Sequence, residues 1–225
     1  MTLCDAPETG DKRVSTTIAW NLDRIQYAYE GNITVTGSGL SWALGFTGLD
    51  DLDLAVKRAT ELADNANVYF VPALAGLGAP YWEESARGSV VGLSFGANRE
   101  HLVRAALEAI VYQIKDVFDA MQDAAGARLE TLLTDGGASK NDWLMQLQAD
   151  LLDRPVLRSR TAELSGLGAA FAAGLGAGFW PSPEELAAAI APHDPFAPAM
   201  DDDARKRLVL GWSRAVESVK MVANK

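Results

Sequence analysis

The sequence is poor in the residues that build disulfide frameworks and transition-metal sites. It contains one cysteine, Cys4, and two histidines, His101 and His193, among 225 residues. A single thiol forms no internal disulfide, and neither histidine has partners at the spacing of a metal site. We therefore expect no disulfide scaffold, no transition metal held by protein side chains, and a reducing compartment, the cytoplasm.

Positive charge is also scarce. The chain has 20 Lys and Arg against 30 Asp and Glu, which gives a formal net charge of −10 at pH 7. The basic residues are scattered, with a short cluster only at Arg205–Arg207. Because a nucleic-acid backbone requires clustered Lys and Arg, this balance excludes a nucleic-acid partner.

Long, strongly apolar runs are missing as well. The start of the chain, Met1–Asp5, has neither a charged nor an apolar leader segment, so we expect no signal peptide. Residues Leu164–Pro181 carry no charge, but glycine and alanine dominate them. A membrane span needs about 20 strongly apolar residues. We therefore interpret this segment as a helix packed closely against its neighbours, and expect no membrane partner.

The sequence does contain alternating strand and helix patterns, which predict one α/β domain over residues 1–225 with a mixed sheet and helices on its faces. Val14–Trp20 and Arg24–Glu30 are expected to form an antiparallel hairpin. Further strands are expected at Val68–Pro72, Val90–Leu93 and Pro155–Arg158, and a short buried strand is expected at Leu129–Leu133. Helices are expected within Gly37–Phe46, at Asp50–Asp64, from the N-cap Asn98 to about Ala125, after Asn141, and from about Glu163. A helical tail (residues 181–225) is expected to contain two more helices, at Pro181–Ile190 and Asp201–Val222. A Pro-rich link, Ala191–Ala199, would join these two.

The most informative stretch is Thr134–Asp142, which lies between a predicted strand and an amphipathic helix. Two adjacent glycines, Gly136 and Gly137, allow another molecule to approach the backbone, and a helix N-terminus suits anionic or polar ligand groups. Ser139 and Asp142 have the spacing of a capping-box variant. On this motif alone, a tight turn into a capped helix is the simpler interpretation.

Other motifs accompany this turn in a fixed order: Pro72–Trp82 with Ala86–Gly88, Gly88–Leu93, His101–Leu102, Ala105–Glu108, Asp135–Ala138, Met145–Asp150 and Leu167–Ala170. Together they resemble the C-terminal domain of the FGGY family of carbohydrate kinases, and its glycerol kinase branch most closely. The resemblance covers about Ser15–Trp180.

This resemblance implies a ribonuclease-H-like α/β fold of the actin, Hsp70 and sugar-kinase type, with ATP or ADP and Mg²⁺ in a cleft between two lobes. The parent enzyme would transfer the γ-phosphate of ATP to a hydroxyl of glycerol or a similar polyol. A kinase of a pentulose such as xylulose or ribulose, and a stand-alone nucleotide-binding interaction module, are the alternatives. The family's catalytic Asp belongs to an N-terminal lobe upstream of this chain, so we expect no kinase activity from the chain alone. That lobe is an expected partner, and an exposed interlobe face would favour homo-oligomers.

By position, Gly137 and its neighbour Gly136 match backbone that packs beside the base or ribose, and Asn141 matches an amide that contacts adenosine. Gly37 matches a second nucleotide-contacting glycine. Ser41 stands where glycerol kinases commonly carry Gln.

Five further residues have structural interpretations beside functional ones. We expect Asp135 to be structural rather than a catalytic base, and Glu108 to be buried and paired rather than lining the cleft. Tyr81 and Trp82 are expected to anchor their loop rather than form a binding platform. Arg87 either reaches a phosphate or holds its loop.

Overall fold

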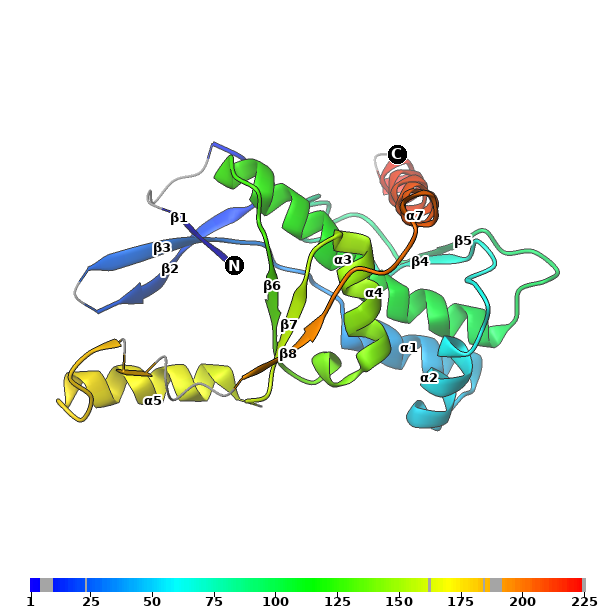
Figure 1. The fold of residues 1–225 in the computed structure, drawn as a ribbon. Helices are drawn as coiled ribbons and strands as arrows, with labels where there is room; N and C mark the ends of the chain where they lie inside the picture. The colour runs from blue at the N-terminus through cyan, green and yellow to red at the C-terminus, as the bar shows by residue number, and fades with distance from the viewer. Residues whose placement is uncertain (5–9, 23, 162, 184, 187–191, 224–225) are drawn as a thin grey trace. The chain divides into compact units, whose positions relative to one another are not determined.

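The computed structural model describes residues 1–4, 10–22, 24–161, 163–183, 185–186 and 192–223. It contains two compact units (Figure 1). The first unit comprises Met1–Trp20, Gln26–Arg128 and Met200–Lys225, and the second comprises Asn21–Ile25 and Leu129–Ala199. Each unit is described by itself.

The first unit begins with a three-stranded sheet in the order β1 (Thr2–Cys4), β3 (Ile25–Glu30), β2 (Ser15–Asn21). β1 runs antiparallel to β3, with Leu3 opposite Ala28. The predicted hairpin strands are therefore confirmed as neighbours. A second antiparallel pair, β4 (Tyr69–Val71) and β5 (Ser89–Val91), confirms the two short strands expected there.

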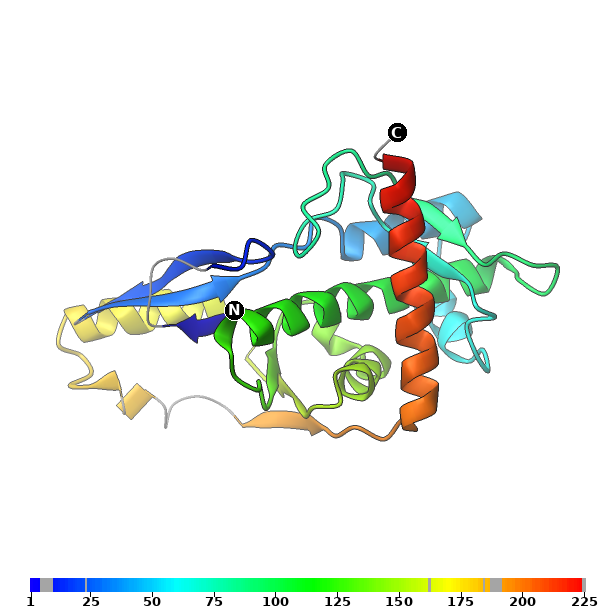
Figure 2. The same ribbon diagram turned by 90° about the horizontal axis from the view of Figure 1, so that it is seen from above.

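The described residues of the first unit also form four helices: α1 (Gly37–Thr47), α2 (Leu52–Thr60), α3 (Arg99–Ala125) and α7 (Asp202–Ala223). The predicted N-cap Asn98 is confirmed, because its side chain accepts a hydrogen bond from the backbone N of His101 at 3.1 Å. His101 returns the interaction, accepting at Nδ1 from the backbone N of Asn98 at 3.2 Å. This reciprocal cap fixes the start of the long helix. α3 contacts α1, α2 and β4, and Figure 2 shows α7 crossing it.

Glu108 is buried on α3 and paired, as predicted. It is 2% exposed and accepts hydrogen bonds from Arg104 Nε at 2.8 Å, Asn65 Nδ2 at 3.0 Å and Tyr112 Oη at 3.2 Å. Burial raises the pKa of Glu108, and the three donors oppose that shift. The network joins α3 to the loop that precedes β4, so its role is structural.

The loop between β4 and β5 is held by the side chains expected to anchor it. Tyr81 Oη donates to Asp116 Oδ2 on α3 at 2.8 Å, and Trp82 Nε1 donates to the carbonyl of Arg13 at 3.1 Å. Arg87 Nη1 donates to the carbonyls of Glu84 and Ala86, so it holds its own loop.

Asp116 also binds α7, because Trp212 Nε1 donates to the same oxygen, Oδ2, at 2.6 Å. Burial raises the pKa of the Asp116 carboxyl from 3.8 to about 6, although both hydrogen bonds favour the charged form. The Asp116 carboxyl therefore ionises at a lower pH in the unfolded chain than in the folded protein, where it is mostly ionised only above about pH 6.

This shift predicts that Asp116→Asn removes part of the pH dependence of stability. Between pH 4 and pH 6 the folded state binds the Asp116 proton more tightly than the unfolded state. The free energy of unfolding should therefore fall as pH rises, by about 3 kcal/mol at most from this group. Urea unfolding at about pH 4.5 and about pH 7 measures the slope. If the free energy of unfolding depends on pH equally in the parent chain and in Asp116→Asn, the raised pKa does not belong to Asp116.

The second unit contains a mixed sheet in the order β6 (Leu132–Thr134), β7 (Val156–Ser159), β8 (His193–Phe196), with α4 (Asp142–Leu152) packed beside it (Figure 1). β6 is parallel to β7, and β8 is antiparallel to β7. The predicted strand before the glycines is confirmed, but its burial is not. Leu133 is 65% exposed, so the face of β6 on which it lies is not covered by other described residues.

Two further expectations for the second unit are corrected. β8 lies inside the segment predicted to be a Pro-rich link. Pro195 is compatible with a strand there because β8 is also an edge strand. The small-residue segment forms helix α5 (Leu164–Gly176), but none of its residues is buried, so the predicted close packing is wrong. Its aromatic side chain Phe171 packs edge-on against Trp180, which follows the same helix.

The two predicted tail helices have different outcomes. The one at Asp201–Val222 is confirmed as α7. Much of the other, at Pro181–Ile190, lies outside the described residues.

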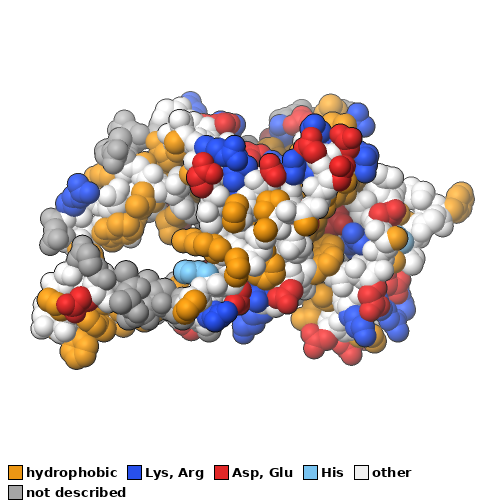
Figure 3. Space-filling view, in the orientation of Figure 1, with side chains coloured by type: hydrophobic (Ala, Val, Ile, Leu, Met, Phe, Trp, Pro, Cys, Tyr) orange, Lys and Arg blue, Asp and Glu red, His pale blue; other side chains and the backbone are white. Residues whose placement is uncertain are grey.

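In the described part of the chain, no helix is both long and apolar enough to cross a membrane. Acidic and basic side chains are interspersed on the face that Figure 3 shows.

Candidate functional site

The site is built on the turn that joins β6 to α4. Gly136 follows β6 with φ +87°, a conformation that favours glycine. Ala138–Lys140 then form a 3₁₀ turn, η1. The backbone thus reverses between the end of a strand and the start of a helix.

The predicted capping box is wrong. Asn141 is the N-cap of α4, because its Oδ1 accepts from the backbone N of Leu144 at 3.0 Å. Ser139 instead donates from Oγ to the carbonyl of Gly136 at 2.8 Å and closes the turn. The capping-box spacing placed the N-cap at Ser139, two residues before Asn141, because η1 interposes a turn. Asp135 is exposed next to this turn, and its structural rather than catalytic role stays a prediction.

The backbone of the two glycines is uncovered. Apart from the glycine itself and its two chain neighbours, no atom of the described residues lies within 4 Å of a Cβ built on Gly136 or Gly137. Gly137 has φ −62° and ψ −45°, which any residue adopts. The chain's own packing and backbone therefore do not require glycine at position 137, whereas close approach of a ligand would.

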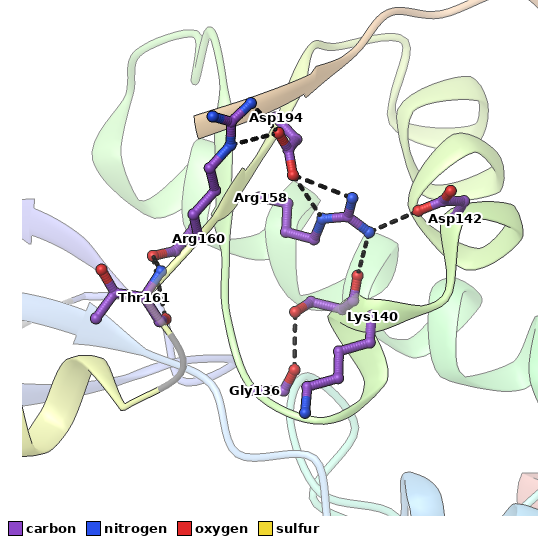
Figure 4. Close-up of a pocket in the computed structure, with 9 residues that line it drawn as sticks. Gly136, Lys140, Asp142, Arg158, Arg160, Thr161 and Asp194 are labelled. Atoms are coloured by element: carbon purple, nitrogen blue, oxygen red, sulfur yellow. Dashed lines mark hydrogen bonds and ion pairs between the residues drawn. The ribbon is translucent and has the colours of Figure 1, made fainter. Parts of the chain in front are cut away.

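A pocket of about 370 Å³ opens beside this turn (Figure 4). It lies where the parallel strands β6 and β7 end, which is where ligands of such sheets bind. Gly136 lines the pocket, while Gly137 and Asn141 belong to the same turn but not to its lining. The other lining residues are Ser139, Lys140, Asp142, Arg158, Ser159, Arg160, Thr161 and Asp194.

Arg158 forms the centre of the pocket's charged cluster (Figure 4). Its Nη1 is 2.6 Å from Asp142 Oδ1, and its Nη2 is 3.1 Å from Asp194 Oδ2. Arg160 Nε also donates to Asp194, at 2.7 Å. The two guanidinium groups lower the pKa of Asp194, with Arg160 making the larger contribution. Both carboxylates of the pocket are therefore already paired with cations.

Lys140 differs from these arginines. It is exposed, and in the described part of the chain no carboxylate forms an ion pair with it. Figure 4 shows its side chain extending away from Arg158. Lys140 is therefore a cation of the pocket that is available to a ligand.

The sequence interpretation missed this cluster. Asp142 in the first turn of a helix and two arginines at a strand end are weak signals by themselves. The partner that joins the arginines, Asp194, lies 36 positions from Arg158, on a strand that was not predicted.

Comparison with known proteins places the chain in a family. Residues 6–177 match the C-terminal domain of the FGGY family of carbohydrate kinases. The chain belongs to this family. Glycerol kinases from Caldanaerobacter subterraneus subsp. tengcongensis and Xanthomonas axonopodis pv. citri are 46% and 48% identical to it over 217 and 218 residues. Each match covers 93% of this chain but 44% of the relative, so the chain spans less than half the length of these relatives.

Solved structures of sugar kinases share the fold. Glycerol kinase from Plasmodium falciparum, solved with ADP, superposes with a TM-score of 0.84 at 35% identity, covering 94% of this chain and 42% of that one. Xylulose kinase from Lactobacillus acidophilus superposes with a TM-score of 0.79 at 22% identity, covering 99% and 44%. The predicted α/β fold of the ribonuclease-H-like, sugar-kinase type is confirmed.

The five residues that were predicted to bind nucleotide in this FGGY chain fall into both units. Gly136, Gly137 and Asn141 lie together in the second unit. Gly37 and Ser41 lie one helical turn apart on α1 in the first unit, and Ser41 Oγ donates to the carbonyl of Gly37 at 3.2 Å. Gly37 and Ser41 are exposed. The nucleotide role of all five residues stays a prediction, as does the extent of the domain over residues 1–225.

Proposed function

We propose that this chain is the nucleotide-binding C-terminal lobe of a kinase that transfers the γ-phosphate of ATP to a hydroxyl of glycerol or a similar polyol. The observation that carries the proposal is the uncovered Gly136–Gly137 backbone at the end of β6, in an FGGY chain whose relatives are glycerol kinases. The pentulose alternative has less support, because the xylulose kinase neighbour is only 22% identical and so speaks to the fold alone.

The residues of the turn fit the adenosine part of ATP or ADP. Gly137 offers backbone that no described side chain covers, which suits the flat face of a base or ribose. The Oδ1 of Asn141 caps α4, so its Nδ2 is the group that can donate to the ligand. Lys140 adds one positive charge beside the turn.

Magnesium would be held mainly by the phosphates of the nucleotide. Asp142 and Asp194, the two carboxylates of the pocket, are each paired with an arginine. Among the described residues, no group of three or more His, Cys, Asp or Glu side chains could hold a metal ion. Because Mg²⁺ in phosphoryl-transfer enzymes commonly binds substrate phosphates with few protein ligands, this arrangement is compatible with the proposal.

The relatives are more than twice as long as the part of them that this chain matches. We propose that an N-terminal lobe supplies the catalytic carboxylate and the polyol site. We also propose that the complete enzyme acts in the cytoplasm. This chain would then bind nucleotide without phosphorylating glycerol.

Replacing Gly137 by alanine tests the nucleotide site. The added methyl group should weaken ADP binding about tenfold or more, because it occupies the space assigned to the ligand. It should also leave folding intact, or stabilise it by about 0.4–1 kcal/mol, because the backbone at residue 137 suits alanine. Isothermal titration with ADP and thermal unfolding measure the two effects.

Gly176→Ala is the matched control. Gly176 is a helical glycine of α5, and no described atom lies within 4 Å of its Cβ position. ADP affinity should be unchanged in this variant. Unchanged affinity in Gly137→Ala as well would remove the turn from the nucleotide site.

A further inference from the structure

Arg158 connects three segments around the candidate nucleotide turn (Figure 4). From β7 it donates through Nη1 to the carbonyl of Ser139 in η1 at 3.1 Å. The same nitrogen is 2.6 Å from Asp142 in the first turn of α4. On its other side, Nε and Nη2 donate to Asp194 of β8 at 3.3 and 3.1 Å.

The contact with Ser139 extends to the glycines. Ser139 is 5% exposed, and its Oγ donates to the carbonyl of Gly136. A continuous series of hydrogen bonds therefore runs from β8 through Arg158 and Ser139 to the backbone at Gly136. The contact with Asp142 fastens the other end of the turn, next to the N-cap Asn141.

The guanidinium group is already engaged on every side that carries N–H groups. Its three nitrogens all donate to protein oxygens, and two carboxylates balance its charge. Its carbon atom lies 5.1 Å from the centre of the Phe196 ring, which supports one face of the group. An arginine that is held in this way shapes its surroundings rather than binding a ligand itself.

We propose that Arg158 is a positioning residue that holds the Gly136–Asn141 turn in the shape that accepts nucleotide. This inference rests on the proposed nucleotide site. Lysine cannot fully replace Arg158 in this positioning role. Its single ammonium group lacks the planar, forked set of donors with which the guanidinium reaches Ser139, Asp142 and Asp194.

The test compares Arg158→Met and Arg158→Lys with the parent chain. ADP affinity is measured by titration well below the unfolding midpoint, and the amide chemical shifts of Gly136 and Gly137 are measured by NMR without ligand. We expect about tenfold weaker ADP binding in Arg158→Met, a smaller loss in Arg158→Lys, and displaced glycine amide shifts in both. A residue that only stabilised the fold would change the unfolding midpoint and leave affinity and shifts of the folded protein unchanged.

Arg154→Met is the matched control. Arg154 belongs to the same unit and donates from Nε to the carbonyl of Leu129 at 3.0 Å, but it does not line the pocket. Its loss should change ADP affinity less than about twofold. If Arg158→Met does not fold, Arg158→Lys decides, since it keeps the charge.

Gly137→Ala separates this inference from the proposed site. Parent-like affinity and shifts in the folded Arg158 variants, with weakened binding in Gly137→Ala, would overturn the positioning role alone. Parent-like affinity in Gly137→Ala as well would overturn the nucleotide site on which that role rests.

Discussion

Trp212→Ala is expected to lower the free energy of unfolding by about 3–5 kcal/mol. Trp212 is 1% exposed and stacks on Tyr112 of α3, with ring centroids 5.1 Å apart. Truncation removes this contact, leaves a cavity between α7 and α3, and takes one of the two donors from Asp116. Since domains are stable by only about 5–15 kcal/mol, this one change would remove a large part of the total.

Trp82→Ala is the control for this experiment. Trp82 also donates from Nε1, to the carbonyl of Arg13, but its side chain is 46% exposed. Its truncation should cost about 1 kcal/mol or less. Urea unfolding followed by far-ultraviolet circular dichroism measures both variants. Equal losses in the two would show that α7 is not held by the buried tryptophan.

The parts of the fold that could be predicted have strong local signals. α3 has an apolar periodicity over 27 residues and an N-cap, Asn98, at its start. Strand β8 has neither signal, because Pro195 suggests a loop. Its pairing with β7 joins Asp194 to Arg158, and such a distant contact leaves no trace in local sequence.

The candidate site also has a part that local sequence predicts and a part that it does not. The Gly136–Gly137 turn could be identified, because a strand pattern, two glycines and a helix pattern adjoin in the sequence. Asn141 was assigned only through the family resemblance. The N-cap of this helix could not be placed correctly from the capping-box spacing, since a 3₁₀ turn and a loop look alike at this length. The arginine cluster depends on tertiary pairing, so its assembly required the structure.

Two glycines of this chain illustrate different reasons for the absence of a side chain. At Gly137 the surrounding space is open and φ is −62°, so the fold itself permits alanine. At Gly92 φ is +88°, and a Cβ would lie 1.9 Å from the carbonyl oxygen of Asn67. We propose that a ligand explains the glycine at position 137, whereas the fold explains the glycine at position 92, so the two variants should behave oppositely.

Gly92→Ala should therefore destabilise the chain by roughly 3–5 kcal/mol, combining a left-handed backbone with an overpacked contact. The clash cannot be relieved by a side-chain rotation, because the atom it meets belongs to the backbone that leads into β4. Relief requires β4 and β5 to separate where Tyr69 pairs with Val91. Gly96→Ala is the control in the same loop, since its Cβ would meet only Ser94 Oγ, at 3.7 Å, among the described atoms. Urea unfolding should show a large loss for residue 92 and almost none for residue 96; similar stabilities would mean that the two strands tolerate a side chain at this crossing.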